Sequence, residues 1–359
     1  MAQIDQFLKV LVEQGGSDLH LTVGSPPVMR VHGHLQRIKF RELSNTDLEA
    51  LVYEIMEEEW RITFVERQDY DFAYEIEGLA RFRANVFWQR KGMGCVLRTI
   101  PSRILTADDL KLPEAVRKMC MLTKGLVLVT GPTGSGKSTT LAAMVDLINS
   151  TRSEHVLTIE DPIEFVHANK KALVNQREIR TNTKSFANAL RAALREDPDV
   201  IMVGEMRDQE TIELGITAAE TGHLVFGTLH TSSAPKTVDR IIDVFPADEQ
   251  EQIRSMLAES LKGVIAQVLL RAKDGKSRMA AWEIMVGTSA IGNLIRENKI
   301  HQIPSIIQTG KKDGMQLLDQ HILEFLMSGK ISAEEAYMKA NNKQAFLQHL
   351  EAPPETDFA

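Results

Sequence analysis

The chain has 359 residues, which is long enough for two domains that each bury a core of their own. Hydrophobic residues make up 43% of it and charged residues 25%, so the composition is that of a folded protein and excludes a disordered one. The net charge of -7 argues against a generally basic nucleic-acid-binding protein, and two cysteines, Cys95 and Cys120, are too few for a disulfide framework or a four-cysteine metal site.

The first hundred residues predict a mixed α/β domain. Residues 4–12 have helical spacing, and a second helix is expected after the start signal at residues 44–47. Strand-like runs occur at residues 18–23, 28–32, 69–76, 80–89 and 93–100. We therefore assign residues 1–100 to an N-terminal domain and residues 101–113 to a linker.

A different pattern of predicted elements begins at Gly125, where short apolar strands alternate with loops and helices. The strands are expected at residues 126–130, 156–160, 200–203 and 224–228, and none of them alternates with polar residues. Strands that are covered on both faces have this pattern, so a parallel α/β core is expected. Residues 249–271 predict a long amphipathic helix that runs into a strand, the remainder to about residue 350 is expected to be mostly helical, and residues 351–359 are expected to be a frayed tail. The second domain is thus assigned to residues 114–350.

Residues 131–138 match the phosphate-binding motif G-x-x-x-x-G-K-[ST] in full, between a predicted buried strand and a predicted helix. In such a loop successive backbone N–H groups surround phosphate oxygens at the N-terminus of a helix. Lys137 is expected to reach the β- and γ-phosphates of ATP, and the Ser138 hydroxyl to bind Mg²⁺. The predicted nucleotide-binding residues here are Gly131, Pro132, Thr133, Gly134, Ser135, Gly136, Lys137, Ser138 and Thr139.

Acidic residues follow two of the predicted strands. Glu160 and Glu164 flank Asp161 at the end of one strand, where three carboxylates need a cation nearby, either Mg²⁺ or an arginine of a neighbouring subunit; a solvated loop is the alternative. Glu205 follows residues 200–203 and is placed to polarise the water that attacks ATP. Gly204 stands where many phosphate-loop proteins carry an aspartate that binds Mg²⁺, so Ser138, phosphates and waters would hold the ion.

Histidines and arginines complete the candidate site. His223, with Thr221, and His230 lie on either side of the strand at residues 224–228, where a histidine could bond a γ-phosphate; a pair of structural histidines is the alternative. Arg81 and Arg83 share one face of a predicted strand. Together with Arg98 they could stabilise charge on a phosphate bound elsewhere, or they form a solvated basic face.

The four segments at residues 131–138, 158–164, 197–208 and 221–231 resemble, in this order, the motifs of the secretion ATPase superfamily, the hexameric motors of type II secretion and type IV pili. The resemblance covers essentially the whole chain. It implies a PAS-like N-terminal domain, a RecA-like ATPase domain with helices at its C-terminal end, and a glycine before the catalytic glutamate. It also implies that the arginines approach the nucleotide as subunits close, within one chain or between chains.

Within this superfamily the chain resembles the PilT-type ATPases of pilus retraction. It lacks the four cysteines of the zinc element in assembly and secretion members, and residues 290–297 resemble the retraction signature A-I-R-N-L-I-R-E except at Gly292. The resemblance implies a homohexamer at the cytoplasmic face of the inner membrane, with a pilus platform protein and a paralogous retraction ATPase as partners. The alternatives are a PilU-like accessory ATPase, a RecA-like nucleic-acid translocase, which the acidic charge disfavours, and a nucleotide switch that does not hydrolyse ATP.

Overall fold

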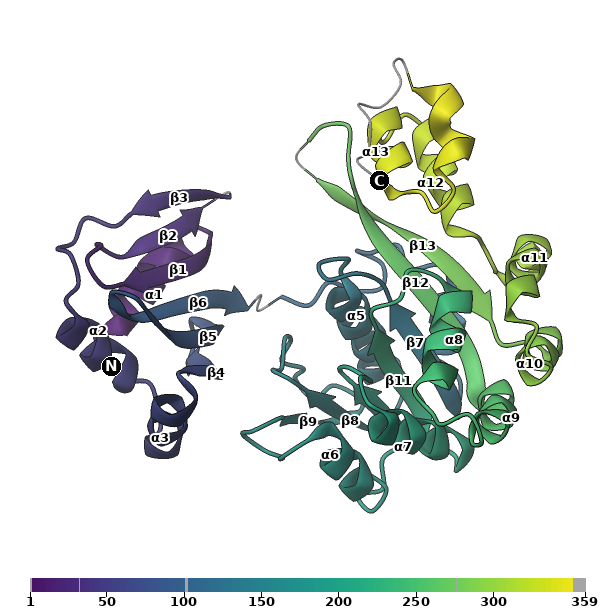
Figure 1. The fold of residues 1–359 in the computed structure, drawn as a ribbon, viewed down its shortest axis with the longest axis horizontal. Helices are drawn as coiled ribbons and strands as arrows, with labels where there is room; N and C mark the ends of the chain where they lie inside the picture. The colour runs from purple at the N-terminus through teal and green to yellow at the C-terminus, as the bar shows by residue number, and fades with distance from the viewer. Residues whose placement is uncertain (1, 32, 101–102, 276, 351–359) are drawn as a thin grey trace. The chain divides into compact units, whose positions relative to one another are not determined.

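The computed structural model describes residues 2–31, 33–100, 103–275 and 277–350 (Figure 1). The chain divides into two compact units. The first comprises the residues up to Arg103 together with Pro162–Val166, and the second comprises Ile104–Asp161 and the residues from His167 onward. In the described residues, no helix is both long enough and apolar enough to span a bilayer.

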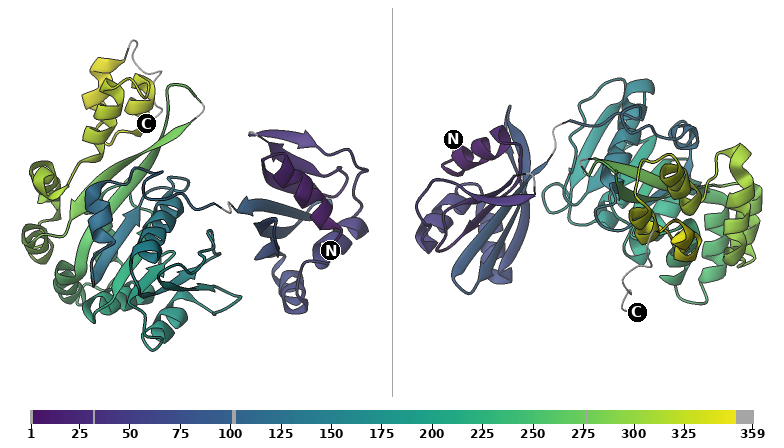
Figure 2. Two further views of the ribbon diagram at one scale, coloured as in Figure 1. Left: turned by 180° about the vertical axis from the view of Figure 1, so that it is seen from behind. Right: turned by 90° about the horizontal axis from the view of Figure 1, so that it is seen from above.

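The first unit is an antiparallel sheet with helices on one face. Its strands are β1 (Gly16–Thr22), β2 (Val28–Val31), β3 (His34–Arg37), β4 (Asp69–Ile76), β5 (Ala80–Gln89) and β6 (Gly92–Ile100), in the spatial order β3-β2-β1-β6-β5-β4. Its helices are α1 (Ile4–Glu13), α2 (Asn45–Tyr53) and α3 (Glu58–Arg67). Leu8, Leu48 and Phe64, one from each helix, share a core with the apolar side chains of the strands, so the helices cover the same face (Figure 2).

The second unit is built on a seven-stranded sheet in the order β13-β12-β7-β11-β10-β8-β9. Its strands are β7 (Gly125–Thr130), β8 (His155–Glu160), β9 (Leu173–Glu178), β10 (Val200–Val203), β11 (Leu224–Leu229), β12 (Leu261–Arg271) and β13 (Arg278–Val286). All neighbours are parallel except β12 and β13. Because β7, β10 and β11 are buried along their whole length, they carry apolar side chains on both faces, as the sequence predicted.

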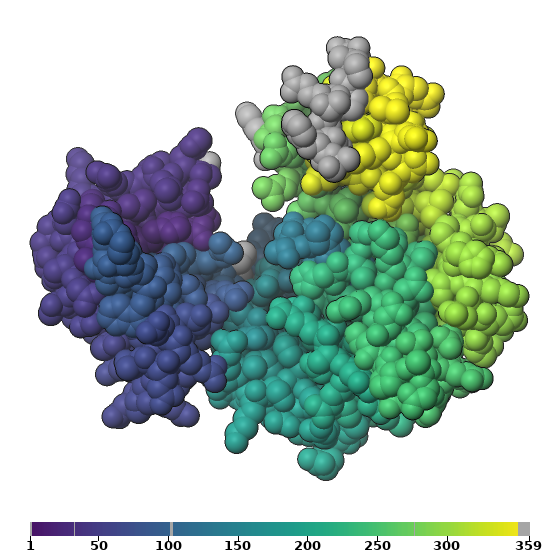
Figure 3. All heavy atoms as spheres, viewed as in Figure 1, coloured from purple at the N-terminus to yellow at the C-terminus, as the bar shows by residue number. Residues whose placement is uncertain are grey.

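Helices cover both faces of this sheet. One face packs against α4 (Glu114–Met119) and α5 (Lys137–Thr151). The other packs against α6 (Phe186–Ala193), α7 (Gln209–Glu220), α8 (Ala234–Asp243) and α9 (Gln250–Ser260), and further along against α10 (Ser289–Arg296) and α11 (Ile303–Thr309). A separate small core joins α12 (Leu318–Met327) and α13 (Ala333–Lys339) to β12 and β13. In Figure 3 the residues of α10–α13, yellow-green to yellow, form a continuous surface of this unit.

The mixed α/β fold class is confirmed, and so is the helix that runs into a strand, because α9 ends at Ser260 and β12 begins at Leu261. The expectation that the chain after residue 271 is mostly helical is wrong for β13, which pairs with β12 along its length. Strands β3 and β9 were also not predicted. Residues 104–113 pack with the second unit through buried Ala107 and Leu112 and are not a free linker there. The predicted frayed tail, residues 351–359, lies outside the described residues.

Candidate active site

The phosphate-binding loop lies at the carboxyl end of β7 and leads directly into α5, as the motif predicted. Gly131 and Gly136 have positive φ angles of 146° and 88°, which L-amino acids with side chains rarely adopt. A Cβ atom at Gly131 would lie 2.3 Å from the backbone oxygen of Gln267, so the loop approaches β12 too closely for any larger residue. The loop shape therefore depends on glycine at both ends.

Two polar side chains of the loop indicate that it fits a phosphate. The Lys137 ammonium group donates to the backbone oxygens of Gly131 at 2.8 Å and Pro132 at 3.3 Å, which holds it over the loop. The Ser135 hydroxyl is buried, and no protein group in the described residues bonds to it. Ser138 and Thr139 lie in the first turn of α5, where backbone N–H groups have no intrahelical partner. The nine nucleotide-binding residues predicted in this segment thus form one continuous loop and helix N-terminus.

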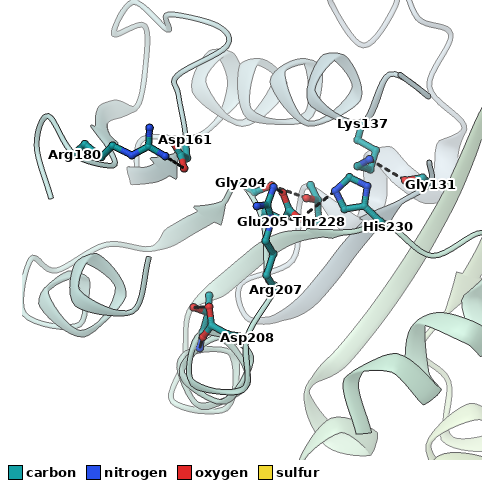
Figure 4. Close-up of polar contacts among 11 residues, drawn as sticks. Gly131, Lys137, Asp161, Arg180, Gly204, Glu205, Arg207, Asp208, Thr228 and His230 are labelled. Carbon is teal, nitrogen blue, oxygen red and sulfur yellow. Dashed lines mark hydrogen bonds and ion pairs between the residues drawn. The ribbon is translucent and has the colours of Figure 1, made fainter. Parts of the chain in front are cut away.

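Glu205 and His230 meet at the same edge of the sheet (Figure 4). Glu205 follows β10, His230 follows the neighbouring strand β11, and Glu205 Oε1 lies 3.1 Å from His230 Nε2. The Glu205 side chain is 17% exposed and also forms an ion pair with Arg207. This bond to Glu205 raises the pKa of the Arg207 guanidinium. Arg207 lies two residues beyond Glu205, and no pattern in the sequence predicts its ion pair with that carboxylate.

Gly204 has a structural reason to be glycine. Its N–H donates to the backbone oxygen of Ile159 at 2.8 Å, and its own oxygen accepts a hydrogen bond from Thr228 Oγ1 at 2.5 Å. A Cβ atom at this position would lie 3.1 Å from the Ile159 oxygen and 3.3 Å from Glu160 Cα. An aspartate here would therefore push the end of β10 away from β8.

The three acidic residues at the end of β8, Glu160, Asp161 and Glu164, have different surroundings in the structure. Glu160 is buried and accepts hydrogen bonds from Thr158 Oγ1 at 2.7 Å and from Gln176 Nε2 at 3.1 Å, so it is not part of a solvated loop. Asp161 forms an ion pair with Arg180 at 3.5 Å. Since β10 and β11 separate β8 from β7, the end of β8 is roughly 14 Å across the sheet from the start of the phosphate loop. Glu164 belongs to the Pro162–Val166 segment of the first unit.

Thr221 and His223 lie at the opposite edge of the sheet from the phosphate loop. They precede β11, and the His223 backbone oxygen accepts a hydrogen bond from Gly125 N–H at the first residue of β7. The length of β7, roughly 16 Å, therefore separates them from Gly131. His223 Nδ1 lies 3.0 Å from the Ala218 oxygen, which ties the histidine to the end of α7. The structure does not bring these two predicted nucleotide-binding residues to the loop of their own chain.

The three arginines lie on the first unit, on the face of the sheet that the helices leave uncovered. Arg83 of β5 is directly opposite Arg98 of β6, and Arg81 lies two residues along the same face. Like charges opposite each other repel, and nearby acids offset this: Arg98 Nε lies 2.8 Å from buried Asp18, and Arg83 Nε lies 3.8 Å from Asp71. The arginines thus form one basic cluster, as the spacing of Arg81 and Arg83 predicted.

Comparison with known proteins gives the family. The family model for type II/IV secretion system proteins matches residues 1–352. The chain belongs to this family. It is 55% identical over 343 residues to the type IV pilus retraction ATPase PilT of Pseudomonas aeruginosa, covering 96% of this chain and 99% of that protein. It is 38% identical to the type IV pilus ATPase PilU of the same species, covering 99% and 93%.

A solved structure supports the family membership. The crystal structure of the pilus retraction motor PilT with bound ADP is 47% identical to this chain and has a TM-score of 0.89. The alignment covers 96% of this chain and 98% of that one. The two-unit architecture described above is therefore that of this family of secretion ATPases, with an N-terminal domain and a RecA-like ATPase domain.

Proposed function

We propose that the chain is an ATP-hydrolysing motor subunit that powers retraction of type IV pili, the pilus disassembly that drives twitching motility. The observation that carries this proposal is the pairing of Glu205 with His230 at the sheet edge that also bears the phosphate loop. The match to a retraction ATPase over almost the whole of both chains supports pilus retraction, and not pilus assembly, as the function of the motor. The lower identity to PilU disfavours the accessory-ATPase alternative.

The phosphate loop is the proposed site of ATP. Backbone N–H groups from Gly134 to Thr139 would surround the β- and γ-phosphates, and Lys137 would leave the loop carbonyls to neutralise them. The described residues contain no group of three or more histidines, cysteines, aspartates and glutamates that could hold a metal ion. Ser138, which follows Lys137 in the motif, would be the protein ligand of Mg²⁺, which when bound supplies positive charge to the phosphates.

Glu205 is the proposed general base. Its carboxylate would accept a proton from the water whose oxygen attacks the γ-phosphorus as the bond to the ADP oxygen breaks. His230 shares the Glu205 carboxylate, so it would sense whether the γ-phosphate is present and report its loss. Glu160 and Glu164 would act as supporting acids. Arg81, Arg83 and Arg98 would stabilise negative charge on the phosphates.

The proposed assembly is a homohexamer in which ATP turnover moves each N-terminal domain against the ATPase domain of a neighbour. Such a ring would act from the cytoplasmic face of the inner membrane on a pilus platform protein, beside a paralogous retraction ATPase. Thr221 and His223, which lie away from the phosphate loop of their own chain, would then act at the subunit interface. Nucleic acid is not expected as a partner, since the chain has a net charge of -7.

The test is steady-state ATPase activity with oligomer size recorded by light scattering. We expect Glu205→Ala to lower kcat by about 10²-fold or more while a fluorescent ATP analogue still binds. Glu213→Ala, which changes an exposed glutamate on α7, is the matched control and should retain activity. A wild-type hexamer that hydrolyses ATP and restores twitching to a retraction-deficient strain supports the proposal. A monomer that binds ATP without turning it over would overturn it in favour of a switch.

A further inference from the structure

A buried glutamine lies directly beneath the phosphate loop. Gln267 is one residue beyond Ala266, which pairs with Thr130, the last residue of β7. Its side chain therefore stands beside the point where the chain leaves β7 for the loop. It points to the same face of the sheet as Ile265, the face covered by α5, and it is only 3% exposed. A polar group in such a place must be hydrogen-bonded to be tolerated.

The glutamine amide is bonded at both ends. Its Nε2 donates to the backbone oxygen of Ser135 at 2.7 Å, in the centre of the phosphate loop. Its Oε1 accepts from Thr140 Oγ1 at 2.7 Å, in the first turns of α5, and from Trp282 Nε1 at 3.1 Å. One side chain thus connects the loop, the helix that follows it and strand β13.

Trp282 determines the orientation of the Gln267 side-chain amide. It pairs directly with Gln267 across β12 and β13, and its indole nitrogen can only donate a hydrogen bond. The amide oxygen must therefore face the indole, which leaves the NH₂ group to face the Ser135 carbonyl. Trp282 is itself held by α12 and by the segment just before it. Its backbone N–H donates to His321 Nδ1 of α12 at 3.1 Å, and its backbone oxygen accepts from Gln316 Nε2 at 2.9 Å.

The same residue limits the loop by contact. A Cβ atom at Gly131 would lie 2.3 Å from the Gln267 backbone oxygen, and one at Gly136 would lie 2.9 Å from Nε2. Gly131 and Gly136, two of the three loop glycines with positive φ, therefore lie against Gln267. The loop therefore packs closely against both the backbone and the side chain of Gln267.

We propose that Gln267 is a positioning residue of the phosphate loop, and that Trp282 fixes its amide so that the Ser135 carbonyl is held back and the loop N–H groups stay turned toward the phosphates. The inference rests on the proposed nucleotide site but not on hydrolysis. Gln267 touches no substrate atom and acts through the loop. Trp282 bonds the same Gln267 amide that holds Ser135. The fluorescence of its indole should therefore change when phosphates bind to the loop.

The first experiment compares Gln267→Glu and Gln267→Leu by the Kd of a fluorescent ADP analogue. Glutamate has the same size but replaces the NH₂ donor with an oxygen that faces the Ser135 oxygen, and leucine removes all three hydrogen bonds of the amide. We expect each to raise Kd by about tenfold or more, the value of one lost buried hydrogen bond with its partner left unpaired. KM for ATP should rise in proportion, while kcat falls by less than about threefold, since Glu205 is untouched.

The matched control is Asn149→Leu. Asn149 is a fully buried amide at the other end of α5, where it bonds to Ala168 and Lys170. The twelve residues from Lys137 to Asn149 place it roughly 18 Å along the helix from the loop. This variant loses a comparable bonded amide and should lose stability, but its Kd for the analogue should stay at the wild-type value. A rise in Kd equal to that of the Gln267 variants would overturn the proposal, since affinity would then simply follow stability.

The second experiment tests Trp282 and keeps the inference testable if Gln267 variants fold poorly. A variant with Trp60→Phe and Trp88→Phe keeps Trp282 as the one tryptophan of the chain. Both substitutions lie in the first unit, away from the phosphate loop in sequence. ADP should shift the emission of Trp282, and Trp282→Phe in the wild-type background should raise Kd by about threefold, as it removes only the donor that orients the amide. If emission does not respond to ADP and Trp282→Phe binds as the wild type does, the proposal fails. Normal hydrolysis in that case would leave the proposed motor function standing.

Discussion

Glu205 Oε1 lies 3.1 Å from Nε2 of His230, whereas His223, seven residues before His230, lies at the opposite edge of the same sheet. A single strand, β11, separates the two histidines, and it delivers only the second of them to the carboxyl edge where Glu205 and the phosphate loop lie. Two histidines of one sequence motif therefore have different surroundings.

The first prediction separates these histidines. His230→Ala should lower kcat for ATP by about tenfold or more, because it removes the group that shares the Glu205 carboxylate. His223→Ala should lower kcat less than His230→Ala does, because His223 lies away from Glu205 and from the phosphate loop of its own chain. It should instead reduce the free energy of unfolding by about 1 kcal/mol, through loss of the contact to Ala218. Steady-state kinetics and urea unfolding of both variants check this, and equal losses of kcat would contradict it.

The second prediction concerns the buried Ser135 hydroxyl, for which no protein partner exists in the described part of the chain. Leaving a buried hydroxyl unpaired costs about 1–3 kcal/mol, so Ser135→Ala should leave Tm of the nucleotide-free protein unchanged or raise it. If the hydroxyl is kept for phosphate, the rise in Tm on adding ADP should be smaller in the variant than in the wild type. Ser150→Ala, at the far end of α5, is the control and should leave the ADP effect unchanged. A lower Tm without nucleotide would show that the hydroxyl is already bonded.

The third prediction concerns Gly204. Gly204→Asp introduces the residue that many phosphate-loop proteins use for Mg²⁺, but its Cβ would lie 3.1 Å from the Ile159 oxygen, on a strand held by its neighbours. We expect the variant to lose about 1–3 kcal/mol of stability and to hydrolyse ATP more slowly, without a lower Mg²⁺ requirement. Mg²⁺ titrations of ATPase activity measure this directly. Faster hydrolysis at low Mg²⁺ would mean that the edge can open to admit the carboxylate.

The fourth prediction is a pH dependence of stability from His167. Burial lowers the pKa of His167 to about 4, against the opposing attraction of Asp146, so the folded protein holds this imidazole neutral. The unfolded chain takes up a proton near pH 6.5, and stability therefore falls as the pH drops from about 6.5 toward 4. Between pH 7 and pH 5 this residue should account for a loss of about 2 kcal/mol.

Urea unfolding at the two pH values tests this contribution. His167→Gln should lose about 2 kcal/mol less than the wild type over the interval, because glutamine does not titrate. His301→Gln changes an exposed histidine and should behave as the wild type does. The same loss in wild type and His167→Gln would assign the acid sensitivity to other groups.

Much of the fold could be predicted because its signals are local. The buried strands β7, β8, β10 and β11 are marked by apolar runs without alternation, and the phosphate loop by glycines followed by lysine and serine. After Arg271 the expectation of a mostly helical segment did not include the strand β13. The apolar run of β13 is short enough to suit either structure, and only its pairing with β12 makes it a strand.

The phosphate loop, the order of the motifs and the position of Glu205 after a buried strand could be predicted from the sequence, because each depends on neighbours along the chain. Three relations became visible only in the folded chain: His230 contacts Glu205 while His223 does not, β8 approaches Gly204 closely, and Gln267 and Trp282 lie beneath the loop. These relations depend on strand order and register between segments far apart in sequence. Sequence periodicity does not reveal which residues of different strands bond to each other. The role of a glutamine in an apolar strand can therefore be recognised only when its hydrogen-bond partners are known.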